Sequence, residues 1–298
     1  MGERLRTRDR SILGAEEPTS PRHNATVEIF DPGDSGFDYD RLVELISDRI
    51  SFVPRYRQRV VMVPGGVANP VWVDDAAFDL GYHVRRSALP RPGTDEQLFE
   101  LVARIVSRPL DRNHPLWEVY FVEGLSDDRV AILYKSHQAL VDGVHTVDLG
   151  QLLLDVTAET KQLEADDWSP RAMPSAPRLL ASAVRDSVSA PTTVVDTVGV
   201  AAANVLQSVD GARQRAGRVT RVLTGRRPAR PSAVFGPLSQ QRRVITLATD
   251  LADYRTVRQA HGGTVNDVIL ATVTGGLRGW LMTRTASMEG VREIRAVV

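Results

Sequence analysis

Residues 116–143 read LWEVYFVEGLSDDRVAILYKSHQALVDG, and this stretch predicts how the middle of the chain folds. Two apolar, β-rich runs, Leu116–Leu125 and Arg129–Lys135, are joined by the acidic segment Ser126–Asp128, which predicts a β-hairpin. The second run leads directly into Ser136–Gly143, and a helical pattern resumes after it. We therefore expect Ser136–Gly143 to lie at a strand–loop–helix junction, where side chains can point into a cleft.

The residues before this hairpin predict a mixture of strands and helices. Ala25–Asp31 alternates apolar and polar residues like a half-buried strand. Arg41–Ile50 carries its apolar residues on one helical face, and Asp40 is placed to cap that helix. Thr94–Gln97 forms a capping box that begins another helix, which Pro109 ends. The first part of the chain is therefore predicted to be an α/β unit of the α+β type.

Composition suggests two further segments after this unit. We predict an N-terminal half over residues 1–160, a linker with helical segments over 161–239, and the start of a second half over 240–298. Nine arginines and no acidic residue fall between Gly211 and Arg243. This run is either a solvated connector or a surface for anionic lipid head groups or phosphates.

The second half begins with a predicted strand at Val244–Ala248 and a helix at Asp253–Ala260, which ends at two glycines. A longer helix is predicted over Thr264–Leu281, with Trp280 in the core. Another strand pattern begins at Arg292–Val298, where the chain ends. Because a strand needs a partner, we expect this chain to hold only the start of the second half. A separate partner chain could supply the rest.

Charge and composition exclude several classes of protein. The 298 residues contain 37 basic and 37 acidic side chains, and this balance argues against a dedicated nucleic-acid binder. The chain has no cysteine, so it has no disulfide, thiolate metal site or thiol nucleophile. No apolar run reaches the ~18 residues that a membrane span needs. We expect a cytoplasmic protein, with peripheral binding to the inner membrane face or to lipid inclusions left open.

The main candidates for chemistry are His137, Gln138, Asp142 and Gly143. A histidine near an aspartate can act as a base that the carboxylate orients, and the glycine allows a sharp turn. A hydrogen-bonded structural histidine is the alternative. His145 lies one helical turn after Asp142 and is a second candidate base. No histidine pair with a third ligand nearby indicates a metal site.

Four segments resemble the bacterial wax ester synthase/diacylglycerol acyltransferase family, within the HHxxxDG acyltransferase superfamily. They are RPLDRNHPLWE at 108–118, SHQALVDG at 136–143, PLSQQRR at 237–243 and GTVNDVIL at 263–270. The resemblance covers most of the chain, and family members usually continue well beyond residue 298. The same superfamily includes peptide-synthetase condensation domains, but the first and last segments favour the lipid acyltransferases.

The resemblance implies a fold of two chloramphenicol-acetyltransferase-like halves and transfer of an acyl group from acyl-CoA to diacylglycerol or a long-chain alcohol. No cofactor beyond acyl-CoA as co-substrate is implied. In this family the second histidine of HHxxxDG takes the proton of the acceptor hydroxyl, and the aspartate and glycine shape the loop. Asn266 and Asp267 match a pair that supports the site from the second half.

This chain departs from that motif at the second histidine, where it carries Gln138. An amide cannot accept a proton at neutral pH, and losing a general base typically costs ~10²–10⁴-fold in rate. Three hypotheses follow. The chain is an acyl-CoA-dependent O-acyltransferase that makes triacylglycerol or wax ester; or it is a weak or inactive paralogue that binds acyl-CoA, lipid or a partner chain; or it is a condensation-type domain for carrier-bound substrates. Ion pairs of Asp111, Arg112 and Glu118 are expected to brace the motif.

Overall fold

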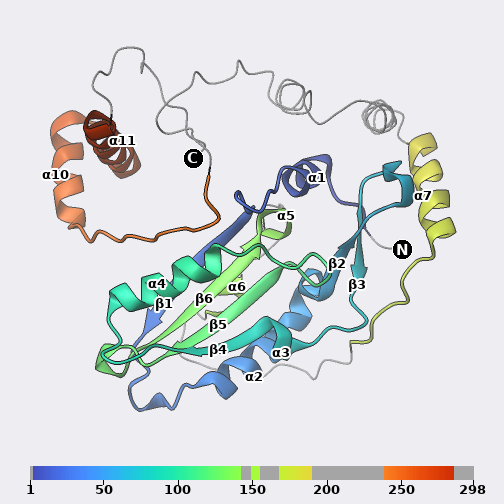
Figure 1. The fold of residues 1–298 in the computed structure, drawn as a ribbon, viewed down its shortest axis with the longest axis horizontal. Coiled ribbons are helices and arrows are strands. Elements are labelled where there is room, and N and C mark those ends of the chain that lie inside the picture. Colours follow the sequence, from blue (N-terminus) through green and yellow to red (C-terminus); the bar gives the residue numbers. More distant parts are fainter. Residues whose placement is uncertain (1–2, 142–148, 155–167, 190–237, 285–298) are drawn as a thin grey trace. The chain divides into compact units, whose positions relative to one another are not determined.

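The computed structural model describes residues 3–141, 149–154, 168–189 and 238–284. The chain forms two compact units, residues 1–210 with 239–244 and residues 211–238 with 245–298. The first unit contains every described strand, and the described helices of the second unit are α10 (Leu251–His261) and α11 (Val265–Arg284) (Figure 1). The predicted segment boundaries at 160 and 240 stay predictions.

A four-stranded sheet forms the centre of the first unit, with the order β1-β6-β5-β4 (Figure 1). β6 is antiparallel to both of its neighbours, and β5 and β4 are parallel, so the sheet is mixed. The predicted hairpin is confirmed as β5 and β6, which the turn at residues 126–128 joins. The strands are β1 (His23–Phe30), β4 (Val84–Ala88), β5 (Trp117–Glu123) and β6 (Val130–His137).

Helices cover both faces of this sheet. On one face, α4 (Asp95–Val106) packs its apolar side against Ala131 and Leu133 of β6. On the other face, α2 (Tyr39–Arg49) and α6 (Leu149–Leu153) pack against Ile132 and Tyr134. Because side chains alternate along a strand, successive residues of β6 belong to different cores. All eight residues of β6 are buried for this reason.

The remaining elements of the first unit lie around the sheet. A two-stranded antiparallel sheet of β2 (Gln58–Val61) and β3 (Val71–Asp74) packs against α7 (Ala176–Ser189). The contact is made by Val71, Val73, Leu179 and Ala183. The N-terminal segment joins this small sheet through a bridge between Arg4 and Val71. These elements are α1 (Thr7–Gly14), β2 (Gln58–Val61), β3 (Val71–Asp74), α3 (Leu80–His83), α5 (Gln138–Val141) and α7 (Ala176–Ser189).

The capping box of α4 is confirmed, because Thr94 accepts from the backbone N–H of Gln97 and the Gln97 side chain accepts in return. The predicted cap of α2 was wrong by two residues. Asp38, not Asp40, caps this helix, because Asp38 has an extended backbone and its carboxylate accepts from the N–H of Arg41 at 2.9 Å. Asp40 lies inside the first turn, where its charge still favours the helix dipole.

In the second unit, α10 (Leu251–His261) and α11 (Val265–Arg284) confirm the two predicted helices. The strand predicted at Val244–Ala248 was wrong. The segment does not pair with any strand among the described residues, and the side chain of Ile245 is 90 % exposed. Trp280, predicted to be in the core, is 41 % exposed. An apolar pattern fixes which face of a segment is apolar, but not whether another element covers that face. The strand predicted at Arg292–Val298 lies outside the described residues.

Candidate active site

The motif that begins at His137 lies at the C-terminal end of the central strand β6. His137 is the last residue of β6, and its backbone N–H donates to the carbonyl of Leu116 at 2.9 Å. Gln138 follows as the first residue of α5, and its N–H donates to the carbonyl of Arg22 at 2.8 Å. The strand that leads into the motif is confirmed, but a loop directly after it was wrong, because β6 passes into α5 without a loop between them; residues 142–148 lie outside the described residues.

The His137 side chain is completely buried. Its Nδ1 accepts a hydrogen bond from the backbone N–H of Ala139 at 3.0 Å, so the ring proton lies on Nε2. Nε2 faces Oε1 of Glu16 at 3.6 Å. With one nitrogen accepting from the backbone and the other facing a carboxylate, this ring has no lone pair to offer a substrate hydroxyl. The described geometry is that of the structural alternative raised by the sequence.

Glu16 connects three segments of the first unit. Its carboxylate accepts from the backbone N–H of Arg22 at 3.1 Å and from the guanidinium of Arg112 at 2.6 Å, and it faces His137. Burial alone would raise the pKa of Glu16, but its contacts with His137, Arg112 and Arg22 outweigh burial and lower the pKa to about 2. Glu16 is therefore a carboxylate at every ordinary pH.

Gln138 is half-buried, and its Nε2 donates to Oδ1 of Asn24 at 3.3 Å. Asn24 lies on β1, opposite Ser136 of β6. The amide donates to Asn24 through its nitrogen, and its oxygen is an acceptor of the kind that can hold a hydroxyl group. It can orient such a group but cannot remove its proton at neutral pH.

The other predicted site residues fall into two groups. Asp142, Gly143 and His145 lie outside the described residues, so their roles stay predictions. Asn266 and Asp267 lie side by side in the first turn of α11, in the second unit. Asp267 accepts from the N–H and the hydroxyl of Thr264, both at 2.7 Å, and these hydrogen bonds lower its pKa. The N–H of Asp267 donates in return to the Thr264 hydroxyl oxygen at 3.2 Å, so in this unit Asp267 and Thr264 together form the capping box of α11.

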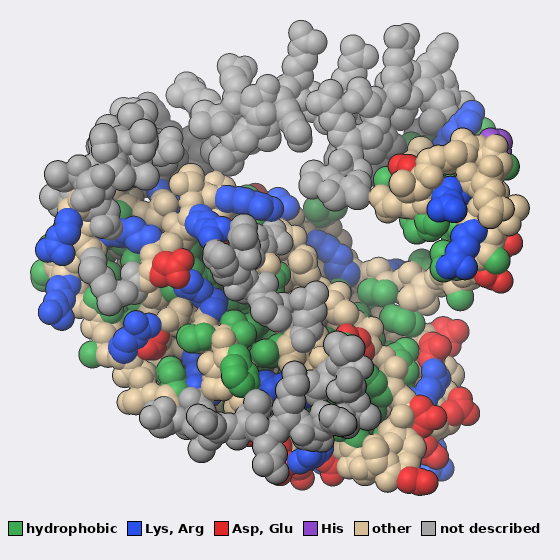
Figure 2. All heavy atoms as spheres, turned by 180° about the vertical axis from the view of Figure 1, so that it is seen from behind, with side chains coloured by type: hydrophobic (Ala, Val, Ile, Leu, Met, Phe, Trp, Pro, Cys, Tyr) green, Lys and Arg blue, Asp and Glu red, His purple; other side chains and the backbone are tan. Residues whose placement is uncertain are grey.

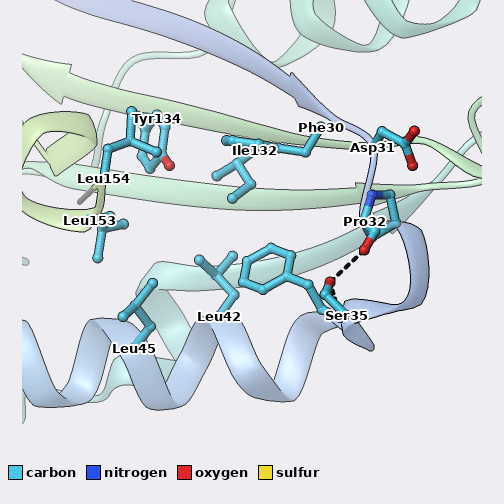
Figure 3. A pocket seen from close by; sticks show the side chains of 11 residues that line it. Phe30, Asp31, Pro32, Ser35, Leu42, Leu45, Ile132, Tyr134, Leu153 and Leu154 are labelled. Carbon is cyan, nitrogen blue, oxygen red and sulfur yellow. Dashed lines mark hydrogen bonds between the residues drawn. The ribbon is translucent and has the colours of Figure 1, made fainter. Parts of the chain in front are cut away.

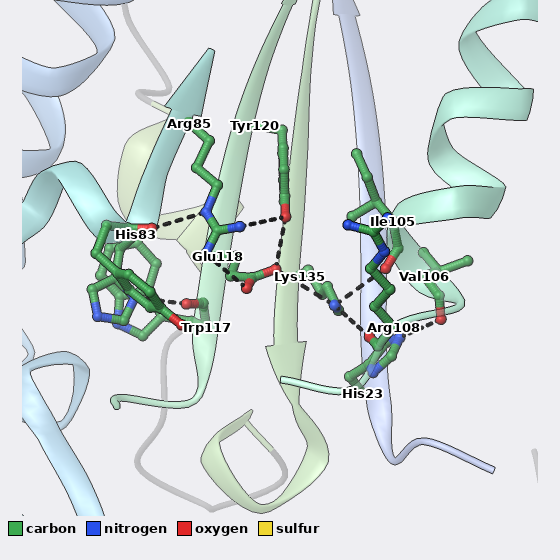
Figure 4. Close-up of polar contacts among 11 residues, drawn as sticks. His23, His83, Arg85, Ile105, Val106, Arg108, Trp117, Glu118, Tyr120 and Lys135 are labelled. Atoms are coloured by element: carbon green, nitrogen blue, oxygen red, sulfur yellow. Dashed lines mark hydrogen bonds and ion pairs between the residues drawn. The ribbon is translucent and has the colours of Figure 1, made fainter. Parts of the chain in front are cut away.

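A buried ion pair supports the strand that carries the motif (Figure 4). Lys135 is 1 % exposed, and its Nζ donates to the carbonyls of Ile105 at 3.2 Å and Arg108 at 2.6 Å. The same ammonium lies 3.5 Å from a carboxylate oxygen of Glu118 on β5. Burial lowers the pKa of Lys135, and Glu118 opposes that shift. Lys135 thus binds the carbonyls at the end of α4 and fixes this helix to the sheet.

Ion pairs were predicted for Asp111, Arg112 and Glu118, and the structure shows them for Arg112 and Glu118. Glu118 also pairs with Arg85 at 3.3 Å and accepts from the Tyr120 hydroxyl at 2.9 Å (Figure 4). Arg112 pairs with Glu16. Asp111 instead accepts from the N–H of Asn113 and shapes its own loop.

Neighbouring histidines are structural in the same way. His83 is 1 % exposed, its Nδ1 bonds the carbonyl of Trp117 at 2.8 Å, and its ring stacks on the Trp117 ring at 4.4 Å. Burial lowers the pKa of His83 to about 4. Burial likewise lowers the pKa of His23, which bonds the carbonyl of Val106, to about 4. Both rings are therefore neutral at pH 7.

Sequence reasoning missed Glu16, Asn24 and Lys135. Glu16 sits in an ordinary polar segment, and only the fold brings its carboxylate beside His137. Lys135 carried one available signal, a lone cation that directly follows the five residues Val130–Tyr134 of a buried strand. Among the described residues, no group of three or more His, Asp or Glu side chains is placed to hold a metal ion. No described helix has the length and apolar character needed to cross a membrane.

Comparison with known proteins places the chain in one family. Residues 5–269 match the family model described as the wax ester synthase/diacylglycerol acyltransferase catalytic domain. The chain belongs to this family, and the resemblance seen in its four segments is confirmed. The chain is similar to a Mycobacterium tuberculosis protein named "Probable diacyglycerol O-acyltransferase tgs3", with 40 % identity over 262 residues, 87 % of this chain and 96 % of the relative.

Longer proteins are also similar. "Probable diacyglycerol O-acyltransferase tgs1" of the same species is 34 % identical over 248 residues, 83 % of this chain and 51 % of the relative. The solved structure of the wax ester synthase/diacylglycerol acyltransferase from Marinobacter aquaeolei VT8 has 25 % identity and a TM-score of 0.63, and covers 94 % of this chain and 60 % of that one. The predicted α/β fold of this acyltransferase type is confirmed. The chain spans about half the length of tgs1 and three fifths of the Marinobacter enzyme.

Proposed function

We propose that this protein transfers a long-chain acyl group from acyl-CoA to the hydroxyl of diacylglycerol, which gives triacylglycerol, or to a fatty alcohol, which gives wax ester. The supporting observation is the 40 % identity that extends over 96 % of a relative named as a diacylglycerol O-acyltransferase. The family match over residues 5–269 includes all four signature segments, except the final residue of the last one.

In the proposed reaction the acceptor oxygen attacks the thioester carbonyl, the C–S bond breaks, and the CoA thiolate takes up the proton that the hydroxyl loses. Gln138 holds the hydroxyl through its amide oxygen while Asn24 fixes the amide nitrogen. Asp142 and Gly143 shape the loop that follows, and His145 is the candidate base nearest to it in sequence. Asn266 and Asp267 remain the supporting pair of the second half.

One observation favours the alternative of a weak or inactive paralogue. His137 cannot replace the missing second histidine where it stands, because its Nδ1 accepts from Ala139 and its Nε2 faces Glu16. In that alternative, the chain keeps the binding surfaces for acyl-CoA or neutral lipid, or pairs with another chain, and lacks an effective base. The two functions differ in turnover and not in what is bound.

Peripheral association with a lipid surface belongs to the same proposal, because both substrates carry long alkyl chains. The arginine-rich run from 211 to 243 is the predicted contact, and only its last residues are described. There the Arg242 side chain donates to the carbonyls of Ser239 and Thr19, both within the first unit. Flotation with anionic vesicles at low and high salt tests this contact, and absence of binding at low salt would remove it.

Acyl transfer from radiolabelled palmitoyl-CoA to diacylglycerol tests the function. The wild-type chain is expected to turn over slowly, and Gln138→His to raise the rate by ~10²–10⁴-fold. Gln259→His places the same imidazole on an exposed glutamine of α10, outside the four signature segments, and should change nothing. A silent wild type with an active Gln138→His chain would establish the inactive paralogue. Silence in both, with acyl-CoA still bound, would leave only a binding function. His137→Ala, by contrast, is expected to lower stability.

A further inference from the structure

Five arginines surround the C-terminal end of α4, close to the end of the sheet that carries the motif. Arg22 directly precedes β1, Arg104 lies in the last turn of α4, and Arg108 lies two residues beyond this helix. Arg242 and Arg243 come from the segment at 239–244, which belongs to the same first unit. We call these five residues the arginine cluster.

Hydrogen bonds bring the three segments of the cluster together. The ring of His23, next to Arg22 in the sequence, bonds the carbonyl of Val106 at 3.0 Å and so joins the start of β1 to the end of α4. The backbone N–H of Arg242 donates to the hydroxyl of Ser107 at 2.8 Å and joins the segment at 239–244 to the same helix end. Segments from three distant parts of the sequence therefore meet at one place.

The described residues do not neutralise the charges of the cluster. Arg22, Arg104, Arg108 and Arg243 form no ion pair with a carboxylate in the parts of the chain that the structure describes. Arg242 donates only to carbonyl groups of those parts. The Nε atom of Arg22 is buried and has no hydrogen-bond partner there. Because buried donors are normally satisfied, this nitrogen indicates a missing acceptor.

The acids nearest to the cluster leave its charge in place. Glu16 is already bound by Arg112 and faces His137. Glu17 and Glu100 are exposed, and neither pairs with an arginine among the described residues. The cluster is therefore a concentration of positive charge with acceptors for few of its donors.

Acidic side chains gather at the opposite end of the sheet. β6 begins at that end with Val130 and reaches the motif at His137. Figure 2 shows acidic side chains at the lower right edge, where Figure 1 places the β1–α2 and β5–β6 connections. The acids in these connections include Asp31, Asp34, Asp38, Asp127 and Asp128. A ligand with several negative charges is therefore attracted to the motif end and repelled from the other end.

A pocket on the face opposite α4 does not provide such a site. It has a volume of about 270 Å³ and lies between the sheet and α2, along Ile132 and Tyr134 of β6 (Figure 3). None of its lining residues is a lysine or arginine, and its one charged lining residue is Asp31. This pocket therefore offers a phosphate group no cation.

We propose that the arginine cluster binds the phosphate groups of coenzyme A and thereby holds the acyl donor. The inference rests on the proposed function and adds to it the place where the donor is recognised. Coenzyme A carries a diphosphate and a further phosphate on its ribose, and guanidinium groups bind phosphate oxygens in a bidentate manner. The carbonyl of Arg22 accepts the N–H of Gln138 at 2.8 Å, so the cluster adjoins the motif. The flexible pantetheine arm can bring the thioester from the cluster to the motif.

The cluster fits coenzyme A better than a membrane surface. Arg22 and Arg242 are partly buried, and a flat layer of lipid head groups does not reach guanidinium groups in that position. Arg104 and Ser107 lie one helical turn apart on the same side of α4, so the cations stand around one helix end. A single ligand with several phosphates can contact them together.

Equilibrium binding of coenzyme A, measured by isothermal titration calorimetry, tests the proposal without any turnover. Coenzyme A should bind at least about tenfold more tightly than pantetheine, which has the same thiol arm and no phosphate. The affinity for coenzyme A should fall as the salt concentration rises, because salt ions screen the exposed arginines. Equal affinities for coenzyme A and pantetheine would overturn the proposal.

Two substitutions locate the binding. Arg108→Ala and Arg243→Ala each remove an exposed guanidinium and should each weaken coenzyme A binding about tenfold, with pantetheine binding unchanged. Arg178→Ala removes an exposed arginine of α7, outside the cluster and the four signature segments, and should leave the affinity unchanged. If a cluster variant fails to fold, Arg104→Ala should show the same loss. Equal affinity in the cluster variants and in Arg178→Ala would place the phosphates elsewhere.

Vesicles of phosphatidylglycerol distinguish the two sources of phosphate. Arg108 lies outside the arginine-rich run at 211–243, so Arg108→Ala should bind these vesicles as the wild type does. A variant that loses vesicle binding and keeps its affinity for coenzyme A would make the cluster a lipid surface and refute the proposal.

Turnover separates this inference from the proposed function. In the acyl-transfer assay, Arg108→Ala should raise the KM for palmitoyl-CoA about tenfold and leave kcat and the acceptor KM unchanged. If the wild type binds coenzyme A in the expected pattern yet transfers no acyl group, the cluster stands and the proposed function fails. If it transfers acyl groups and Arg108→Ala leaves the KM for palmitoyl-CoA unchanged, the cluster assignment fails alone.

Discussion

Nε2 of His137 faces Oε1 of Glu16 at 3.6 Å, and the two side chains are only 1 % and 5 % exposed. The same carboxylate binds Arg112, so it ties the N-terminal segment, the loop before β5 and the motif to one point. A buried carboxylate with these partners stabilises the folded state only while it is ionised.

Glu16→Gln should therefore destabilise the protein. The pKa of Glu16 is about 2 in the folded state against the ordinary 4.5, so its stabilisation is present above pH 4.5 and is lost as the pH falls toward 2. The free energy of unfolding should fall by about 2–3 kcal/mol at pH 7. Urea denaturation at pH 7 and pH 3 measures this, with the exposed Glu17→Gln as control. An equal loss at both pH values would contradict the assigned role.

Lys135→Met should be more costly than removal of a surface cation. It leaves Glu118 in the sheet without its ammonium partner and frees the carbonyls of Ile105 and Arg108 at the end of α4. A loss of about 3–5 kcal/mol in unfolding free energy is expected. Arg41→Met breaks the exposed pair with Glu44 and should cost at most about 1 kcal/mol. Comparable losses would mean that Lys135 is not held as described.

His83 should make stability depend on pH below neutrality. Its pKa is about 4 when folded and 6.5 ordinarily, so it contributes stability above pH 6.5 that is lost between pH 6.5 and 4. His83→Phe keeps a ring beside Trp117 and removes this titration, at a cost of about 1 kcal/mol for the lost hydrogen bond at pH 7. The drop in unfolding free energy from pH 7 to pH 4 should be smaller in the variant. The exposed His261→Phe should leave the drop unchanged.

Alanine substitutions at Gly93 and Gly33 distinguish the cost of backbone strain from the cost of a steric clash. Both have positive φ, +78° and +49°, so alanine is strained at each. A Cβ at Gly93 would meet the carbonyl oxygen of Gly124, whereas a Cβ at Gly33 would meet nothing within 4 Å. Gly33→Ala should cost about 1–2 kcal/mol and Gly93→Ala at least about 3 kcal/mol of unfolding free energy. Thermal unfolding of both variants compares them directly, and equal shifts would rule out the contact at Gly93.

The sequence determined the elements whose signals are local. The hairpin of β5 and β6 follows from two apolar runs with an acidic turn, and the start of α4 follows from the capping box of Thr94 and Gln97. The motif segments also identified the family, because they are short and carry their residues at fixed spacing. The strand predicted at Val244–Ala248 failed because an alternating pattern needs a neighbouring strand, which no local signal supplies.

Only the tertiary structure decided what the motif histidine can do. His137 and Gln138 were named from the sequence, but Glu16 and Asn24, which engage them, come from distant segments with no periodic signal of their own. The pocket along β6 likewise exists only where β1, α2 and α6 meet. A local sequence pattern predicts the hydrogen bonds within one segment and which of its faces is apolar. The availability of a ring nitrogen, or the shape of a cavity, depends on side chains that the fold brings together from several segments.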